Sequence, residues 1–301
     1  MRMSATMKSR FPDVARPRKA PDVVRAVRPR VVDDEDRAHG SYCSPMRALL
    51  AQLESVPGDP GANAERAAAA LAAHPEAELA VFPELYLGAY DLRAVDDTAR
   101  SVDCDELGTV AEAAARARTA VVIGFAERNG DGSFSNSVAC IDRDGSLAGV
   151  YRKTQLYAGE RKVFRPGAEL RVVRLAGLAV APLICFDIEF PEPVRALALA
   201  GAELLVTSSA NMEPFAPDHE LATRARALEN RLPHLYANAV GAIGRLDFVG
   251  RSRSVGPAGE VLAEAGGEES LLLVPVGTAG AASESLDYLS QLPEPLPVVV
   301  S

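Results

Sequence analysis

Short runs of apolar residues alternate with longer amphipathic stretches along most of the chain. The apolar runs are rich in Val, Leu and Ile and are bounded by turn residues, which is typical of buried strands. The stretches between them are rich in Ala, Leu, Glu and Arg, which favour helices. We expect strands at 48–53, 78–82, 120–125, 137–142, 147–151, 178–185, 204–207, 235–240, 254–256 and 271–276, and helices at 62–73, 105–118, 193–200 and 219–231.

Strands and helices that alternate in this way predict an α/β fold. Two segments repeat one order: a helix leads into the stretch 76–81 or 201–206, and the strand in each stretch ends at a polar loop. The first loop carries Glu84 and the second carries Asn211. Two similar helix–strand units suit a sandwich built from two sheets.

The composition indicates one large globular domain. The chain has 301 residues, of which 48% are hydrophobic, and this is enough for a complete core. Its net charge of −9 disfavours general binding to nucleic acid or to an anionic membrane. No apolar run approaches the roughly 20 residues of a membrane span. Four cysteines without C-x-x-C spacing do not resemble a disulfide framework or a zinc site, so we expect a protein of the reducing cytoplasm.

The N-terminal segment differs from the rest. Residues 1–46 carry ten Lys or Arg and six Asp or Glu, a net charge of +4, and since the whole chain carries −9 the remainder carries −13. Arg and Pro are scattered through it, and it has no continuous apolar segment, so it does not resemble a secretory signal. We expect residues 1–45 to be a disordered extension, or to precede a functional start at Met46. A basic arm that binds nucleic acid is the alternative.

Several motifs of cofactor and metal sites are absent from the sequence. No G-x-x-x-x-G-K-[ST] phosphate loop occurs, and the glycines at 241 and 244 lack the remaining glycine of a dinucleotide fingerprint. His219-Glu220 is not followed by a second His at the spacing of a zinc-protease helix. We therefore expect all four histidines to be surface or packing residues rather than ligands: His39, His74, His219 and His234.

Cys185 is the first candidate for covalent chemistry. It ends the apolar run 178–185, and a helix is expected soon after it. A nucleophile at a strand-to-helix turn has an exposed side chain with backbone N–H groups nearby, which can stabilise a developing oxyanion. Taken alone, such a cysteine is more often a buried structural residue. The segments around it decide between the two interpretations.

Three segments resemble the signature segments of the nitrilase superfamily, in the family's order and at similar spacing. They are Phe82-Pro83-Glu84-Leu85, Tyr151-Arg152-Lys153-Thr154 and Leu183-Ile184-Cys185-Phe186-Asp187-Ile188-Glu189-Phe190-Pro191-Glu192. Supporting stretches lie at 201–204, 210–212, 224–230 and 236–238, and the resemblance covers about residues 47–290. Within the superfamily the chain is most similar to bacterial aliphatic amidases, including those that act on 5-aminovaleramide.

The resemblance implies a four-layer α-β-β-α sandwich over residues 46–280. It also implies that two copies pair through their helical faces, as a homodimer or a larger assembly. Residues 281–301 contain Asp287-Tyr288-Leu289 and several prolines, and we expect them to form a C-terminal arm that crosses the dimer interface. We expect the helix around Arg224, Arg226 and Glu229-Asn230 to be a structural helix with internal salt bridges.

The resemblance implies that Cys185 is a nucleophile that works without a metal or an organic cofactor. A thiol is mostly protonated near pH 7, and the three segments contain no His, so a carboxylate must take its proton. Glu84 matches the family's general base, and Lys153 matches the cation that favours the thiolate and holds the oxyanion. The backbone N–H of Phe186 is expected as a second oxyanion donor, and Glu160 as a second, orienting glutamate.

The chain departs from the family's frequent pattern at two places. Gln155 replaces the His that often follows Lys-Thr, and Ser208-Ser209 stand where Pro-Thr is frequent. We expect these residues not to touch the catalytic set but to alter the shape of the pocket. By analogy with the family, Asn211 is expected to line that pocket.

Glu189 suggests the substrate class. It lies four residues after Cys185, near a position where relatives that take carboxylate substrates often have Arg. A pocket carboxylate repels anionic substrates and attracts cationic ones. We therefore hypothesise a short amide with a distal amine or guanidine, such as 5-aminovaleramide or 4-guanidinobutyramide. The alternative is that Glu189 is structural and pairs with the backbone or with an Arg.

Three functions remain open on the sequence. The first is an amidase that converts a small aliphatic amide to its acid and ammonia through a cysteine thioester. The second is N-carbamoyl hydrolysis, nitrile hydrolysis or acyl transfer by the same three residues, since chemistry up to the thioester is shared. The third is a catalytically silent binding or scaffold protein. We expect a small-molecule amide as the partner, and neither nucleic acid nor a membrane.

Overall fold

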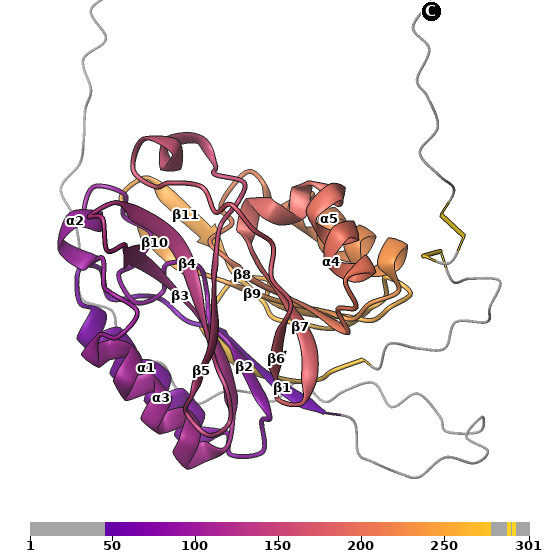
Figure 1. The fold of residues 1–301 in the computed structure, drawn as a ribbon, viewed down its shortest axis with the longest axis horizontal. Coiled ribbons are helices and arrows are strands. Elements are labelled where there is room, and N and C mark those ends of the chain that lie inside the picture. Colours follow the sequence, from indigo (N-terminus) through magenta and orange to yellow (C-terminus); the bar gives the residue numbers. More distant parts are fainter. Residues whose placement is uncertain (1–45, 278–287, 290, 293–301) are drawn as a thin grey trace, which may run out of the picture.

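The computed structural model describes residues 46–277, 288–289 and 291–292 (Figure 1). The predicted N-terminal extension and most of the predicted C-terminal arm lie outside these residues. The helices are α1 (Pro60–Ala73), α2 (Val95–Thr98), α3 (Asp105–Ala117), α4 (Pro191–Leu199) and α5 (Ala216–Asn230), with 3-10 helices η1 (Ala158–Lys162) and η2 (Cys185–Glu189). The strands are β1 (Arg47–Gln52), β2 (Leu79–Val81), β3 (Ala120–Arg128), β4 (Phe134–Ile141), β5 (Leu147–Arg152), β6 (Val173–Leu175), β7 (Leu178–Ile184), β8 (Leu204–Ser209), β9 (His234–Asn238), β10 (Val240–Ile243), β11 (Leu246–Val249), β12 (Arg253–Val255), β13 (Val261–Glu264) and β14 (Ser270–Pro275).

Two six-stranded sheets with matching topology form the centre of the molecule. Their strand orders are β14-β1-β2-β3-β4-β5 and β13-β12-β9-β8-β7-β6. The inner strands β1, β2 and β3 run parallel in one sheet, as do β7, β8 and β9 in the other, and the remaining pairings in both sheets are antiparallel. The repeated stretches 76–81 and 201–206 therefore lead into equivalent inner strands, β2 and β8.

Side chains alternate between the two faces of each strand and fill three layers of core. In β1, Leu49 and Ala51 pack with α1 and α3, whereas Ala48 and Leu50 pack between the two sheets. The far face of the second sheet packs against α4 and α5. Figure 1 shows the helix pair α1/α3 on one side and α4/α5 on the other, with the sheets between them. The predicted four-layer α-β-β-α sandwich is confirmed.

The predicted helices are all present, and three of them begin two or three residues earlier than expected. Each of these three has a proline in its first turn, where a missing N–H costs nothing: Pro60, Pro191 and Pro217. The Asp59 side chain also caps α1 by accepting a hydrogen bond of 2.9 Å from the N–H of Ala62. In α5, Arg226 forms an ion pair with Glu229, as expected for a structural helix.

The predicted strand 235–240 is wrong at its end, and four strands were missed. The chain leaves the second sheet after Asn238, and Val240 begins the separate two-stranded sheet β10–β11. The missed strands β6, β10, β11 and β13 have only three or four residues, too few to show a reliable alternation. Within the described residues, no helix is both long and apolar enough to cross a membrane.

The fold brings four strand ends from both sheets to one edge of the sandwich. Glu84 follows β2, Lys153 follows β5, Cys185 follows β7, and Ser209 is the last residue of β8. Hydrogen bonds join the sheets there: the N–H of Glu84 donates to the Ser209 carbonyl (3.3 Å), and the N–H of Ala210 donates to Glu84 Oε2 (3.0 Å). Residues far apart in the sequence therefore meet at this edge.

Candidate active site

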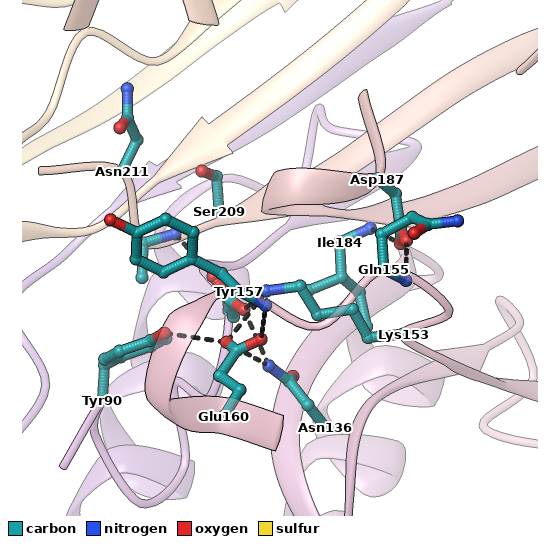
Figure 2. Close-up of polar contacts among 12 residues, drawn as sticks. Tyr90, Asn136, Lys153, Gln155, Tyr157, Glu160, Ile184, Asp187, Ser209 and Asn211 are labelled. Carbon is teal, nitrogen blue, oxygen red and sulfur yellow. Dashed lines mark hydrogen bonds and ion pairs between the residues drawn. The ribbon is translucent and has the colours of Figure 1, made fainter. Parts of the chain in front are cut away.

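A lysine between two glutamates forms the centre of this edge. Lys153 Nζ lies 2.6 Å from Glu84 Oε1 and 2.9 Å from Glu160 Oε1, and all three side chains are buried. Figure 2 shows Lys153 beside Glu160. A buried charge is stable only when it is paired and hydrogen-bonded. One cation shared by two carboxylates leaves the group with a formal charge of one negative unit, which further hydrogen bonds must stabilise.

Asn136 and Tyr90 supply these hydrogen bonds. Asn136 Nδ2 donates to Glu84 Oε1 (2.7 Å) and lies 3.2 Å from Glu160 Oε1, while the Tyr90 hydroxyl donates to Glu160 Oε1 (2.8 Å). The second oxygen of Glu160 accepts from the backbone N–H of Tyr157 (2.8 Å). Both oxygens of Glu160 are thus occupied, which fits a residue that orients Lys153.

The surroundings raise the pKa of both Glu84 and Lys153. Burial, and the negative charge of Glu160, raise the pKa of Glu84 to about 7, against the opposing effect of Lys153. Burial alone would lower the pKa of Lys153, but the two glutamates outweigh it and raise that pKa above its ordinary value. Lys153 therefore stays a cation, and Glu84 is a carboxylate group that can exchange a proton near neutral pH.

Cys185 lies at a strained turn beside this group. Its φ is +44°, a left-handed conformation that L-residues other than Gly, Asn and Asp adopt rarely, and it joins β7 directly to η2. Burial and the Glu84 carboxylate raise the pKa of the thiol, whereas Lys153 and hydrogen bonds to the Ser209 side chain and Ala210 backbone lower it. Because the net effect is a raised pKa, the resting thiol keeps its proton.

Asp187 holds the turn in shape. This buried carboxylate accepts hydrogen bonds from the N–H of Ile184 (3.0 Å) and the hydroxyl of Tyr151 (2.9 Å). It also accepts from the Thr154 hydroxyl (3.0 Å) and the N–H of Gln155 (2.9 Å; Figure 2). The segment around Lys153 is thereby fastened to the segment around Cys185.

A pocket of about 230 Å³ opens at the thiol. Most of its wall is aromatic or apolar, and two carboxylates, from Glu189 and Asp218, lie in it. Phe186 makes edge-to-face contacts with Tyr157 and Phe190, at ring-centroid distances of 5.4 and 5.1 Å. The lining residues are Tyr90, Tyr157, Cys185, Phe186, Glu189, Ala210, Asn211, Met212, Phe215, Asp218 and His219.

The predicted site residues all lie at this place. Glu84, Lys153 and Glu160 form the buried charged group, and Cys185, Phe186, Glu189 and Asn211 line the pocket. The amide of Asn211 is already used locally, since it donates to the Phe215 carbonyl (3.0 Å) and accepts from the N–H of Met212 (2.9 Å). Asn211 therefore shapes the pocket wall.

Two expectations about polar neighbours are corrected. Within the described residues, Glu189 has no hydrogen bond to the backbone and no ion pair with an Arg; its Oε1 lies 3.3 Å from Nε2 of His219. Ser209 touches the catalytic group, because its carbonyl accepts from the N–H of Glu84, where no contact was expected. Gln155 and Ser208 do not line the pocket.

Sequence reasoning missed the contacts of Asn136, Tyr90 and His219. Each is a single polar residue in a largely apolar or loop segment, so no local pattern distinguishes it. Asp187 was within a quoted family segment, which was the available signal. Among the residues that the structure describes, no cluster of three or more His, Cys, Asp or Glu could hold a metal ion.

Comparison with known proteins identifies the family. The model of the carbon-nitrogen hydrolase family matches residues 47–281. An (R)-stereoselective amidase of a Pseudomonas species is 39% identical over 249 residues, which cover 81% of this chain and 90% of that protein. A nitrilase of Pyrococcus abyssi is 35% identical over 194 residues, which cover 63% of this chain and 72% of that protein.

Solved structures agree with the sequence comparison. A crystal structure of an amidase from a Nesterenkonia species has 32% sequence identity and a TM-score of 0.75, covering 83% of this chain and 94% of that chain. Both the sequence and the sandwich are thus shared with amidases over most of the chain. The chain belongs to the carbon–nitrogen hydrolases of the nitrilase superfamily, and it is a hydrolase that acts on amides.

Proposed function

We propose that this enzyme hydrolyses a small aliphatic amide through a thioester on Cys185. The observation that carries the proposal is the buried Glu84–Lys153–Glu160 group beside a thiol that opens into a pocket. A general base near pH 7, a fixed cation and a nucleophile are what acyl transfer requires.

Acylation begins with the thiol. Glu84 takes the proton of Cys185 as the sulfur attacks the amide carbon, because the raised pKa of the thiol keeps it protonated until then. The carbonyl oxygen becomes an oxyanion, which the Lys153 ammonium and the N–H of Phe186 stabilise. Protonated Glu84 then gives its proton to the leaving nitrogen, the C–N bond breaks, and ammonia departs. The acyl group remains on sulfur as a thioester.

Deacylation repeats the sequence with water. Glu84 takes a proton from water as its oxygen attacks the thioester carbon, and the same two donors hold the second oxyanion. The C–S bond then breaks, the carboxylic acid leaves, and the sulfur takes back the proton from Glu84. Glu160 touches neither reacting atom and acts through Lys153, whose ammonium it holds at 2.9 Å.

The Nesterenkonia amidase supports a nucleophilic cysteine and a short aliphatic amide as the substrate. One of its structures shows the acetamide moiety of fluoroacetamide added covalently at the active-site cysteine. Another contains butyramide, a short aliphatic amide. Both are 32% identical in sequence to this chain, with TM-scores of 0.75.

We further propose that the substrate carries a distal amine or guanidine. Glu189 and Asp218 both lie in the pocket, and none of its described lining residues is Lys or Arg. Burial lowers the pKa of His219, so this neighbour is neutral near pH 7 and leaves the charge of Glu189 uncompensated. A volume of about 230 Å³ suits a chain of a few carbons such as 5-aminovaleramide.

The test is ammonia release from amides with matched acyl chains. The panel contains neutral, amino, guanidino and carboxy forms, and we expect the amino and guanidino forms to have the highest kcat/KM. Glu189→Gln should lower kcat/KM for 5-aminovaleramide by about tenfold, a loss of roughly 1.4 kcal/mol. It should lower kcat/KM for butyramide by less. Glu192→Gln, on the exposed first turn of α4, is the matched control and should change neither rate.

Product analysis separates the related reactions. Good hydrolysis of N-carbamoyl amino acids with release of carbon dioxide, and none of amino-amides, would contradict the proposed substrate class. Hydrolysis of nitriles, or transfer of the acyl group to an amine, would assign the same residues to another reaction. No turnover and no covalent labelling of Cys185 would favour a silent scaffold.

We also propose a homodimer that works in a reducing compartment. The outer layer of α4 and α5 exposes leucines, of which Leu221 is 71% and Leu199 60% accessible, and burial of such residues favours association. Cys104, Cys140 and Cys185 are free thiols, which is usual where disulfides are kept reduced.

A further inference from the structure

Two donors hold the same pair of carboxylate oxygens at the active-site edge. Lys153 Nζ lies 2.6 Å from Glu84 Oε1 and 2.9 Å from Glu160 Oε1. Asn136 Nδ2 lies 2.7 Å from the first of these oxygens and 3.2 Å from the second (Figure 2). The four atoms form a closed ring in which nitrogen donors and oxygen acceptors alternate. The ammonium and the amide therefore hold the two glutamates together.

The carboxylates determine the orientation of the Asn136 amide. The side chain is buried, and its Oδ1 has no hydrogen-bond partner within the described residues. A buried acceptor without a partner costs free energy, and such an exception in a folded protein calls for a reason. Turning the amide over would place Oδ1 against two carboxylate oxygens, which are also acceptors. The hydrogen bonds to Glu84 and Glu160 therefore hold the amide in this orientation.

The two oxygens of Glu84 are not equivalent. A carboxylate oxygen has two lone pairs, and those of Oε1 accept hydrogen bonds from Lys153 and Asn136. In the part of the chain that the structure describes, Oε2 accepts one hydrogen bond, from the N–H of Ala210 at 3.0 Å. One lone pair of Oε2 is therefore left to receive a proton.

Oε2 also faces the sheet that carries the nucleophile. Its donor Ala210 follows β8, which pairs with β7 up to Ile184 and Ser208, and Cys185 comes directly after Ile184. The donors to Oε1 belong to the first sheet, since Asn136 is on β4 and Lys153 follows β5. The filled oxygen of Glu84 is therefore held by the first sheet, and the open one is held by the sheet of Cys185.

We propose that Asn136 is a positioning residue for catalysis: with Lys153 it fills Oε1 of Glu84, so that the proton of Cys185 is taken up and returned at Oε2. The S–H bond breaks and an O–H bond forms at Oε2 as sulfur attacks, and the same proton then passes to the leaving nitrogen. Without this donor, Oε1 has an open lone pair that competes for the proton. The inference rests on the proposed roles of Glu84 and Cys185.

The hydrogen bond from Asn136 also favours the charged form of Glu84. Burial, with the charge of Glu160, raises the pKa of Glu84 to about 7, whereas Lys153 and the Asn136 amide act against this rise. Loss of the donor therefore raises this pKa further, and kcat/KM begins to rise only at a higher pH. The other titratable or charged groups around Glu84, which remain in place, are Lys153, Glu160, Tyr90, Cys185 and Tyr236.

The test is the pH profile of ammonia release by Asn136→Ala in the full chain. The acid limb of kcat/KM should move up by about one pH unit, so that kcat/KM at about pH 6 falls roughly tenfold. The loss should be smaller at a pH above the limb. Asn230→Ala is the matched control, because Asn230 is also buried with an unpartnered Oδ1 but donates to the Arg226 carbonyl on α5. It should leave the limb at its native pH.

Asn136→Leu keeps a branched side chain without a donor and should move the limb in the same direction. It also tests the proposal should Asn136→Ala fail to fold. An unmoved limb in both variants, or a loss of kcat/KM that is equal at every pH, would overturn the proposal. Failure of the proposed function has a different signature: Cys185→Ala would still release ammonia, or the native enzyme would show no acid limb near pH 7.

Discussion

At the residue scale, the site is organised around one lysine held by two carboxylates. Lys153 lies within 3 Å of both Glu84 and Glu160, and this arrangement determines what each acid can do. Glu84 receives one of these hydrogen bonds and has a pKa near 7, so it can take and return a proton. Glu160 is also held on both oxygens, and its proposed role is to position Lys153.

The negative charge of Glu160 close to Glu84 predicts how kcat/KM depends on pH. Glu84 must be a carboxylate to take the thiol proton, so kcat/KM should rise as pH increases through about 7. Because the charge of Glu160 raises the pKa of Glu84, Glu160→Gln should move this acid limb to lower pH. Its amide should also disturb Lys153 and lower kcat by about 100-fold. The measurement is the pH profile of ammonia release, and an unmoved or upward-shifted limb would contradict the coupling.

The sequence predicted the residues that belong to motifs and missed those that depend on register. Glu84, Lys153 and Cys185 lie in segments whose neighbours resemble a family, so each could be placed without a structure. Asn136 is a single polar residue in a buried strand. It reaches the site only because β4 pairs with its neighbours in one register, and no local pattern in the sequence encodes that pairing.

At the element scale, β3 supports the loop that carries Glu84. A Cβ on Gly124 would lie 2.3 Å from the Pro83 carbonyl and 2.8 Å from the Cα of Glu84. The Gly124 carbonyl also accepts from the N–H of Leu87 at 3.1 Å. The strand and the catalytic loop are therefore in direct backbone contact, and this position has no room for a side chain.

Gly124→Ala should displace the Glu84 loop. We expect a loss of about 1–3 kcal/mol in the free energy of unfolding and about a 100-fold lower kcat. Gly108→Ala, in the interior of α3 with open space around it, is the control and should stabilise by about 0.5–1 kcal/mol. Urea unfolding and ammonia release measure both effects. A fully active Gly124→Ala would show that the loop is not held by this contact.

At the scale of the whole molecule, the helical layer formed by α4 and α5 exposes leucine side chains. Leu199 on α4 and Leu221 and Leu228 on α5 are exposed in the described structure, on the helical layer outside the second sheet. Leu221 and Leu228 are seven residues apart and share one face of α5. This face is the proposed dimer interface.

Light scattering should give about twice the chain mass of 31.8 kDa for the native protein. Leu221→Lys should lower the measured mass to that of the monomer, because a buried unpaired charge at an interface costs several kcal/mol. Leu147→Lys changes an equally apolar exposed residue on β5, in the other sheet, and should leave the dimer intact. A native monomer at micromolar concentration would rule this interface out.

The covalent intermediate tests the central claim most directly. The native enzyme is quenched with acid during turnover of 5-aminovaleramide, and the Cys185 peptide is weighed, with ammonia release measured in parallel for Cys185→Ala. We expect the peptide to gain the mass of the 5-aminovaleryl group and the variant to release no ammonia. Turnover without an acyl group on Cys185, or undiminished ammonia release by Cys185→Ala, would contradict the account.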